Sequence, residues 1–249
     1  MKKLFALLIT AFAITMAKAG PVVIIKADDF RAPNQAWTNF LEVSRQAGIK
    51  VSIGIIAESI AGKTETADWL RAQEKHGDVE FWDHGWDHKQ WKLGDQTVSE
   101  FGGSGLEHQR DHFMRAQAEL KTALGHDVAV FGTPYNAFDT NTATIINETP
   151  ALRLFFAHGV TQVRRELGPR VTVIDVISET GGTGKPDASG FEALWNKRAA
   201  AGQLDEPVSL QFHPPYFDAA HLAEYGKIIA FLKAQGCTIK LPAECMTQP

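Results

Sequence analysis

The sequence predicts an α/β fold and favours a small barrel of parallel strands over an open sheet. Short apolar runs alternate with helical patterns along nearly the whole 249-residue chain. Such alternation is typical of parallel strands covered by helices. About seven or eight strands in a chain of this length suit one barrel domain, although alternation alone does not separate a barrel from a sheet. We find no internal repeat or linker that would divide the chain.

Strands are expected where β-branched and aromatic residues form short runs bounded by turn residues. Helices are expected where apolar residues recur every three or four positions, as with Trp37, Phe40 and Leu41 before Gly48. The expected strands are 22–27, 50–57, 78–82, 127–132, 152–157, 170–177 and 207–212, with 238–241 as a strand that closes the set. The expected helices are 34–48, 64–77, 108–125, 140–150, 191–202 and 219–236.

The N-terminus has the pattern of a secretory signal peptide over residues 1–19. Lys2 and Lys3 precede an apolar run over 4–17, and Ala17-Lys18-Ala19 is a small-x-small cleavage site. The run is too short for a comfortable membrane span. We therefore expect cleavage after Ala19, a secreted or periplasmic protein without stable membrane insertion, and one catalytic domain over 20–249. A buried N-terminal helix is the alternative.

The charge of the chain limits its partners, and its cysteines raise the question of a disulfide. The formal net charge is −4 and no stripe of Lys and Arg is present, so nucleic acid is an improbable partner. Cys237 and Cys245 are the two cysteines. A disulfide between them is possible in an exported protein, and two reduced thiols remain an equal alternative because sequence does not report their separation.

Polar residues follow the first and third expected strands, and in such barrels chemistry lies at the C-terminal ends of the strands. Asp28 and Asp29 end the first strand, where they repel each other and point to opposite sides. A bound metal, or separate roles for the two carboxylates, would explain this pairing; a solvated turn is the alternative. His84 and His88 follow the third strand, and two imidazoles with a carboxylate form a common metal set in hydrolases.

Two later strand ends carry further candidate catalytic groups. Tyr135, in a Pro-Tyr turn after the strand at 127–132, offers a backbone N–H suited to a developing oxyanion. His213 follows a late strand and precedes two prolines, a position expected of a general acid.

Together these motifs resemble the polysaccharide deacetylases of carbohydrate esterase family four. The shared pattern is an Asp-Asp after the first strand, H-x-x-x-H after the third, a Pro-Tyr turn, and a late Leu followed by His. Their order and spacing match over nearly all of the chain after residue 19. The resemblance implies a distorted (β/α) barrel of about seven parallel strands in a single domain.

The same resemblance implies roles for the residues at the strand ends. A divalent metal, often zinc, would be bound by Asp29, His84 and His88. Asp28 would be the general base, the Tyr135 amide an oxyanion donor, and His213 the general acid. The implied activity is removal of acetyl groups from an N-acetylated or O-acetylated polysaccharide or oligosaccharide.

Several positions depart from the family pattern and indicate a divergent branch. Gly132 stands where the family has an Arg that holds the base, and Lys26 stands where Thr or Ser is usual. Lys26 lies two residues before Asp28, so both side chains face the same way on a strand. Lys26 is therefore a candidate catalytic residue, as the ionic partner of Asp28 in place of the Arg. A Lys that covers the barrel end is the alternative.

Candidate substrate residues flank these motifs: Trp86, Trp91, Glu100 and Asn136. Trp86 and Trp91 are expected in a loop, where aromatic faces could stack on sugar rings, whereas Trp82 sits in strand alternation and suits the core at least as well.

Two other features have plainer interpretations. His108 and His112 form a second H-x-x-x-H, which we interpret as a solvated helix face because no carboxylate is obviously placed as a third ligand. Glu179 lies in a Gly-rich loop that is either a lid or an ordinary flexible loop.

Three functions are consistent with these patterns. The first is an exported metal-dependent carbohydrate deacetylase. The second is a metal hydrolase of a non-sugar amide or ester on the same fold. The third is a metal-binding or glycan-binding homologue without catalysis, which the missing Arg favours.

Overall fold

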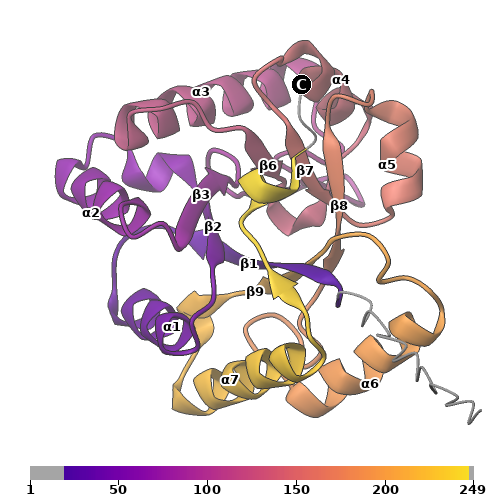
Figure 1. The fold of residues 1–249 in the computed structure, drawn as a ribbon. Helices are drawn as coiled ribbons and strands as arrows, with labels where there is room; N and C mark the ends of the chain where they lie inside the picture. Colours follow the sequence, from indigo (N-terminus) through magenta and orange to yellow (C-terminus); the bar gives the residue numbers. More distant parts are fainter. Residues whose placement is uncertain (1–19, 247–249) are drawn as a thin grey trace, which may run out of the picture.

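A computed structural model describes residues 20–246, in which seven parallel strands close into one barrel surrounded by helices (Figure 1). Around the barrel the strand order is β1-β2-β3-β6-β7-β8-β9, and β9 pairs with β1 to close it. These strands are β1 (Val22–Phe30), β2 (Val51–Ile55), β3 (Val79–Asp83), β6 (Val130–Gly132), β7 (Leu154–Ala157), β8 (Thr172–Ile177) and β9 (Val208–Phe212). The predicted barrel of about seven parallel strands in a single domain is confirmed.

Helices follow most strands and form the outer layer of the barrel (Figure 1). Carboxylates cap the N-termini of two of these helices. Asp139 accepts backbone N–H groups at the start of α4, and Asp218 does so at the start of α7. The helices are α1 (Gln35–Gln46), α2 (Thr64–Glu74), α3 (Leu106–Leu124), α4 (Thr140–Glu148), α5 (Val160–Glu166), α6 (Ala188–Ala200) and α7 (Ala219–Ala234).

The barrel is distorted at the seam between β3 and β6. Only one pair of residues, Asp83 and Phe131, is in register there, whereas β1 and β9 are paired over five positions. The chain between β3 and β6 is long and contains α3 and an antiparallel hairpin of β4 (Gln90–Leu93) and β5 (Gln96–Ser99). The sequence analysis missed this hairpin, although Gly94-Asp95 between two alternating runs is a turn signal.

The last expected strand, 238–241, is present but shorter, and it lies outside the closed ring of seven strands. β10 (Thr238–Ile239) pairs only with Val22 and Val23 at the start of β1, and β9 makes the closure. A 3₁₀ turn, Pro242–Cys245, then lies over the N-terminal ends of the strands. There the Ala243 N–H donates to Glu80 at 2.9 Å, so this end of the barrel is covered.

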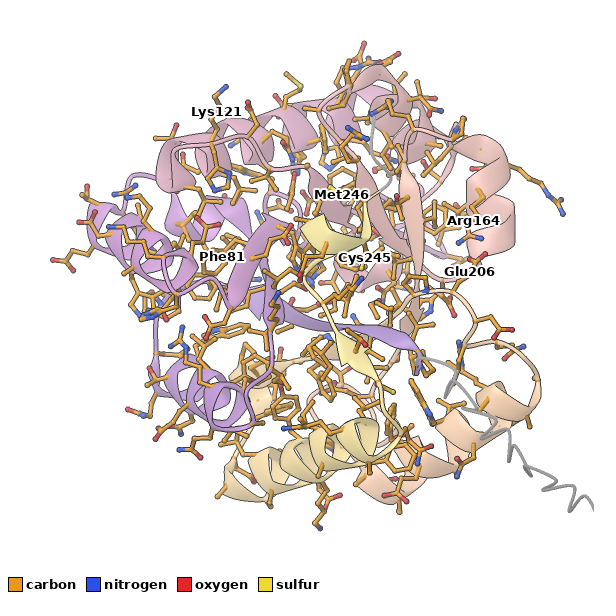
Figure 2. All side chains as sticks on the ribbon, viewed as in Figure 1. Phe81, Lys121, Arg164, Glu206, Cys245 and Met246 are labelled. Carbon is orange, nitrogen blue, oxygen red and sulfur yellow. The ribbon has the colours of Figure 1, made fainter. Side chains whose placement is uncertain are left out.

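Side chains fill the barrel interior and the space beneath the helices (Figure 2). Trp82 of β3 is fully buried, as its strand alternation suggested. A Cβ at Gly54 would lie 2.4 Å from the Trp82 ring and one at Gly132 would lie 2.8 Å from it. The two glycines therefore leave the room that the Trp82 ring occupies.

An ion pair at the surface joins α5 to the segment before β9. Arg164 of α5 and Glu206, in the segment before β9, are ion-paired at 2.5 Å (Figure 2). Cys237 and Cys245 are not bonded to each other in the structure. Among residues 20–246 no helix is long and apolar enough to cross a membrane. The predicted signal peptide, 1–19, lies outside the described residues.

Candidate active site

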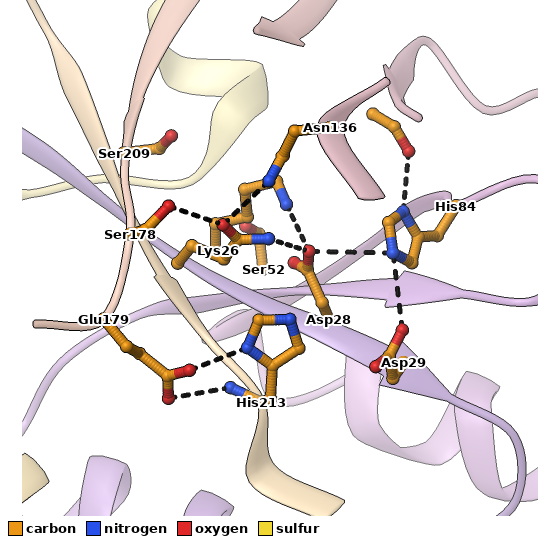
Figure 3. Close-up of polar contacts among 12 residues, drawn as sticks. Lys26, Asp28, Asp29, Ser52, His84, Asn136, Ser178, Glu179, Ser209 and His213 are labelled. Carbon is orange, nitrogen blue, oxygen red and sulfur yellow. Dashed lines mark hydrogen bonds and ion pairs between the residues drawn. The ribbon is translucent and has the colours of Figure 1, made fainter. Parts of the chain in front are cut away.

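The C-terminal ends of the strands surround a cavity of about 690 Å³. Asp28 and Asp29 reach it from β1, His84 from the loop after β3, and His213 from the end of β9 (Figure 3). His88, from the same loop as His84, also lines the cavity. Tyr135 and Asn136, in the turn after β6, complete the set of predicted residues that line it. The structure therefore brings together residues that are far apart in the sequence, from Asp28 to His213.

Asp29, His84 and His88 face one another with the geometry of a cation site. The Nε2 atoms of His84 and His88 lie 3.5 and 3.0 Å from Asp29 Oδ1, and one ligand atom from each residue falls within 4.8 Å of the others. Asp29 Oδ1 is buried and has no hydrogen bond of good geometry. A divalent cation would satisfy it, so these residues fit the predicted metal.

The tautomer of His84 also suits metal binding. Its Nδ1 lies 2.7 Å from the carbonyl oxygen of Gly132, to which it donates, so Nε2 carries a free lone pair toward Asp29. Burial would raise the pKa of Asp29, but the neighbouring imidazoles of His84 and His88 outweigh burial and hold that pKa well below its usual value. Asp29 is therefore ionised beside the two imidazoles.

Backbone strain is concentrated around the cavity. Among residues 20–246, four residues other than glycine have a left-handed φ, and all four line this cavity. They are Asp29 (69°), His88 (58°), Tyr135 (60°) and Asn136 (52°). Such conformations cost on the order of 1–3 kcal/mol each and persist where the surroundings impose them, typically at functional sites.

Asp28 is held as an anion beside this metal set. Its Oδ2 accepts hydrogen bonds from Lys26 Nζ at 2.5 Å and from Gln211 Nε2 at 2.7 Å, while its Oδ1 is buried without a partner (Figure 3). Burial alone would raise the pKa of Asp28, but the charges of Lys26 and His84 outweigh it, and the pKa is lowered. The sequence analysis missed Gln211, although Gln211 faces the same way as His213, two residues later on the strand.

The predicted contact between Lys26 and Asp28 is confirmed, and its surroundings explain the absent Arg. Lys26 and Asp28 are both fully buried. The ammonium of Lys26 lies 4.7 Å from the centre of the Trp82 ring, a favourable cation–π distance. A side chain at Gly132 would collide with the same ring. Lys26 on β1 thus lies beside Asp28, and Gly132 on β6 leaves room for the Trp82 ring.

His213 is oriented by Glu179, whose role the sequence analysis did not find. Glu179 Oε2 lies 2.7 Å from His213 Nδ1, and Oε1 accepts the His213 backbone N–H at 3.1 Å. Burial would lower the pKa of His213, but the hydrogen bond and charge of Glu179 outweigh it and raise that pKa above its usual value. The Glu179 side chain is almost fully buried, so its contact with His213 is shielded from solvent.

Hydrogen bonds hold Tyr135 and Asn136 in the wall of the cavity. The Tyr135 hydroxyl donates to the His88 carbonyl oxygen at 2.9 Å, and its ring lies 4.4 Å from the His88 ring. Asn136 Nδ2 donates to Gln211 Oε1 at 3.0 Å, which links this turn to β9. The oxyanion role of the Tyr135 amide and the substrate role of Asn136 stay predictions.

Three predicted substrate residues do not line the cavity. Glu100 is fully buried, and backbone N–H groups surround its carboxylate. Trp86 is buried beneath the guanidinium of Arg115, 4.1 Å from its ring centre. Trp91 stands on β4, with its ring centre 5.3 Å from that of His108. The exposed aromatic rings at the cavity are instead Tyr135 and Tyr216.

The interpretation of His108 and His112 as a solvated face is also wrong. His112 is buried, and its Nδ1 lies 3.1 Å from Glu100 Oε1 and 3.8 Å from Asp87 Oδ1. Asp87, Glu100 and His112, which we call the Glu100 cluster, form a second group of potential ligand atoms within 4.8 Å of one another. The three residues of this cluster come from three separate segments of the chain, so no local spacing in the sequence could have indicated the cluster.

Comparisons with known proteins agree with this fold. The polysaccharide deacetylase family model matches residues 16–152, a span that includes Asp28, Asp29, His84, His88 and Tyr135 but not His213. No functionally curated protein matches the chain.

Three solved structures have similar folds. The CE4 domain of a multidomain xylanase from the hindgut metagenome of Trinervitermes trinervoides has a TM-score of 0.61 and 16% identity, over 91% of this chain and 89% of that one. A family 4 acetyl xylan esterase from Clostridium thermocellum, in complex with cobalt, has a TM-score of 0.62 and 14% identity over 90% and 89%. A CE4 pseudoenzyme from Bacillus anthracis has a TM-score of 0.61 and 13% identity, over 91% of this chain and 65% of that one. The polysaccharide deacetylase model covers more than half of the present chain, so this chain belongs to the polysaccharide deacetylase family.

Proposed function

We propose that this protein is an exported, metal-dependent hydrolase that removes acetyl groups from an N-acetylated or O-acetylated glycan. The observation that supports it most directly is the arrangement of two chemically different carboxylates around one cavity. Asp29 faces two imidazoles, whereas the adjacent Asp28 is paired with Lys26 and keeps one oxygen free. A cation site next to an ionised base is the arrangement that acyl hydrolysis by activated water requires.

Asp29, His84 and His88 would hold the cation, for which we propose Zn²⁺ because imidazole and carboxylate donors suit it. A divalent cation there supplies Lewis-acid activation of water and of the acetyl carbonyl. A cation also explains why the chain tolerates Asp28 next to Asp29, because positive charge relieves the repulsion between the two carboxylates.

Asp28 serves as the general base through Oδ1, the oxygen without a hydrogen-bond partner. Lys26 and Gln211 fix the other oxygen, so the carboxylate cannot turn away from the cavity. The low pKa of Asp28 keeps it ionised and ready to accept the proton of the attacking water.

His213 serves as the general acid, whereas Asp28 serves as the base. Its Nδ1 is occupied by Glu179, which leaves Nε2 to donate a proton to the departing amine or alcohol. An amine cannot leave as an anion, so this proton is needed in amide hydrolysis. The Tyr135 amide, from the turn between them, would donate to the oxyanion that forms on the acetyl carbonyl.

Acetate release from a panel of substrates tests the proposal. The metal-loaded protein is incubated with acetylated xylan, N-acetylated chito-oligosaccharides and a non-sugar acetamide, and the Asp28→Asn variant is the control. We expect acetate from at least one saccharide, and a variant that keeps its metal but is about 10²–10⁴-fold slower. Release from the acetamide alone would favour a non-sugar hydrolase, and metal binding without any turnover would favour an inactive homologue.

Export is tested separately by the mass of the protein recovered outside the cytoplasm. The proposal expects a chain that begins at Gly20. A chain that retains residues 1–19 and stays in the cytoplasm would contradict it.

A further inference from the structure

The loop that carries the second histidine ligand is held from behind by one carboxylate. Three successive backbone N–H groups point at Glu100. Trp86 donates to Oε1 at 2.5 Å, while Asp87 and His88 donate to Oε2 at 3.3 and 2.8 Å. Consecutive amides that converge in this way form a concave anion site, and here the anion is a side chain of the same protein.

The packing around Glu100 shows that its approach to the loop is built into the sequence. Glu100 follows β5 and is fully buried, and its backbone N–H donates to the Lys89 carbonyl oxygen at 3.1 Å. A Cβ at Gly85 would lie 2.8 Å from Glu100 Oε2, and Gly85 has a φ of 82°. A glycine is therefore needed at position 85 both for its backbone and for the carboxylate.

His112 of α3 supplies the fourth contact, with Nδ1 at 3.1 Å from Glu100 Oε1. A carboxylate has about four lone-pair positions, and the three amides and His112 occupy all of them. A cation could bind Glu100 only by displacing one of these donors. Glu100 is therefore saturated with hydrogen-bond donors and is not a free metal ligand.

We propose that Glu100, supported by His112, is a positioning residue that fixes His88 for cation binding. This inference rests on the proposed function. His88 has a φ of 58°, a conformation that costs on the order of 1–3 kcal/mol and needs an outside constraint. The N–H of His88 itself is one of the bonds to Glu100, so the carboxylate constrains the strained residue directly.

The substitution Glu100→Gln tests this proposal because it preserves volume and removes the charge. One oxygen becomes an NH₂ group that faces N–H donors, so the loop loses part of its anchor. We expect the affinity for Zn²⁺, measured by competition with a chromophoric chelator, to fall about 10- to 100-fold, as is typical when a partner behind a metal ligand is lost. The d–d absorption bands of the Co²⁺-loaded protein should change as well, because they report the arrangement of the ligands.

Asp139→Asn is the matched control. Asp139 is also a carboxylate that accepts backbone N–H groups, from Gly103, Asn141 and Thr142, but it has no contact with the loop over 85–88. Its loss should lower the melting temperature without changing Zn²⁺ affinity or the Co²⁺ spectrum. This comparison separates an effect on His88 from a general loss of stability.

Substitutions of His112 keep the inference testable if Glu100→Gln does not fold. His112→Leu removes the fourth donor and should weaken Zn²⁺ binding by less than Glu100→Gln does. His112→Asn should restore the affinity, because its amide nitrogen is as many bonds from Cα as Nδ1 is.

Three results would overturn the inference. Zn²⁺ affinity and Co²⁺ spectra that are unchanged in Glu100→Gln and in His112→Leu would show that the cluster does not position His88. Two cations per wild-type chain, with only one in Glu100→Gln and the spectrum of that one unchanged, would make the cluster a metal site. A wild-type chain that binds no cation would contradict the proposed function itself, and the inference with it.

Discussion

Two groups of carboxylate and imidazole side chains lie on either side of one loop, and they are suited to different tasks. The Asp29–His84–His88 set faces the cavity, and Asp29 Oδ1 is buried there without a good hydrogen bond. In the Glu100 cluster, by contrast, N–H donors fill every lone-pair position of the Glu100 carboxylate. The residue types alone do not distinguish the two groups; the hydrogen bonds that each carboxylate already accepts do.

A second comparison concerns two buried pairs of Glu and His. Glu179 and Glu100 each accept backbone N–H groups, and each contacts an imidazole Nδ1, at 2.7 Å for His213 and 3.1 Å for His112. His213 lines the cavity, whereas His112 is packed beneath the loop. Under the proposed mechanism, the same local chemistry would serve proton transfer at His213 and loop geometry at His112.

The largest expected effect is loss of the metal when Asp29, His84 and His88 are all replaced by Ala. Elemental analysis should then find no bound cation, against one per chain in the wild type, because the Glu100 carboxylate has no free lone pair to replace the lost ligands. His108→Ala, as the control, should keep one cation. One cation per chain in the triple variant would contradict the distinction between the two groups.

The next largest effect is expected from Lys26→Met, which leaves Asp28 buried without its cation. Removing one partner of a buried ion pair costs about 3–5 kcal/mol, so the free energy of unfolding from urea titration should fall by that order. The pKa of Asp28 should rise because the lowering charge is gone, and the acidic limb of the pH–rate profile should move to higher pH.

Lys50→Met is the matched control for Lys26→Met. Lys50 is paired with Glu244 at the surface, where each side chain is 39% exposed. Such pairs contribute about 0–1 kcal/mol, so stability should change little and the pH–rate profile should not move. An unchanged acidic limb in Lys26→Met would remove Lys26 from the mechanism.

The barrel and the residues at its strand ends could be predicted because both depend on local patterns. Alternation of strands and helices indicates the fold, and a polar residue directly after an apolar run, such as Asp28 or His213, is placed at the cavity by topology. The partners of these residues could not be predicted in this way. Gln211 contacts Asp28 across 183 positions and Glu179 contacts His213 across 34, and no periodic pattern reports such contacts.

The errors around His84 and His88 have a related cause. Trp86, Trp91 and Glu100 lie near the histidines in sequence, but proximity does not tell which side of a loop a residue faces. The hairpin of β4 and β5 carries Trp91 away from the cavity, and Glu100 returns beneath the loop. His108 and His112 have the same spacing as His84 and His88, yet they lie on a helix that packs behind the loop.

The smallest expected effect is a shift in the pH–rate profile of Glu179→Gln, which distinguishes the two Glu–His pairs. Burial lowers the pKa of His213 and Glu179 raises it, so removing the charge of Glu179 should lower that pKa. A general acid works while it is protonated, and activity is lost as the pH rises through its pKa. The alkaline limb of kcat/KM should therefore move to lower pH.

The affinity of Glu179→Gln for Zn²⁺ should equal that of the wild type, because Glu179 contacts neither Asp29 nor the loop that carries His84 and His88. Glu100→Gln should show the opposite pattern, with weaker metal binding and an alkaline limb that stays in place once the metal is saturating. An alkaline limb that does not move in Glu179→Gln would mean that His213 is not the acid. Weaker Zn²⁺ binding in that variant would mean that the two pairs are not functionally separate.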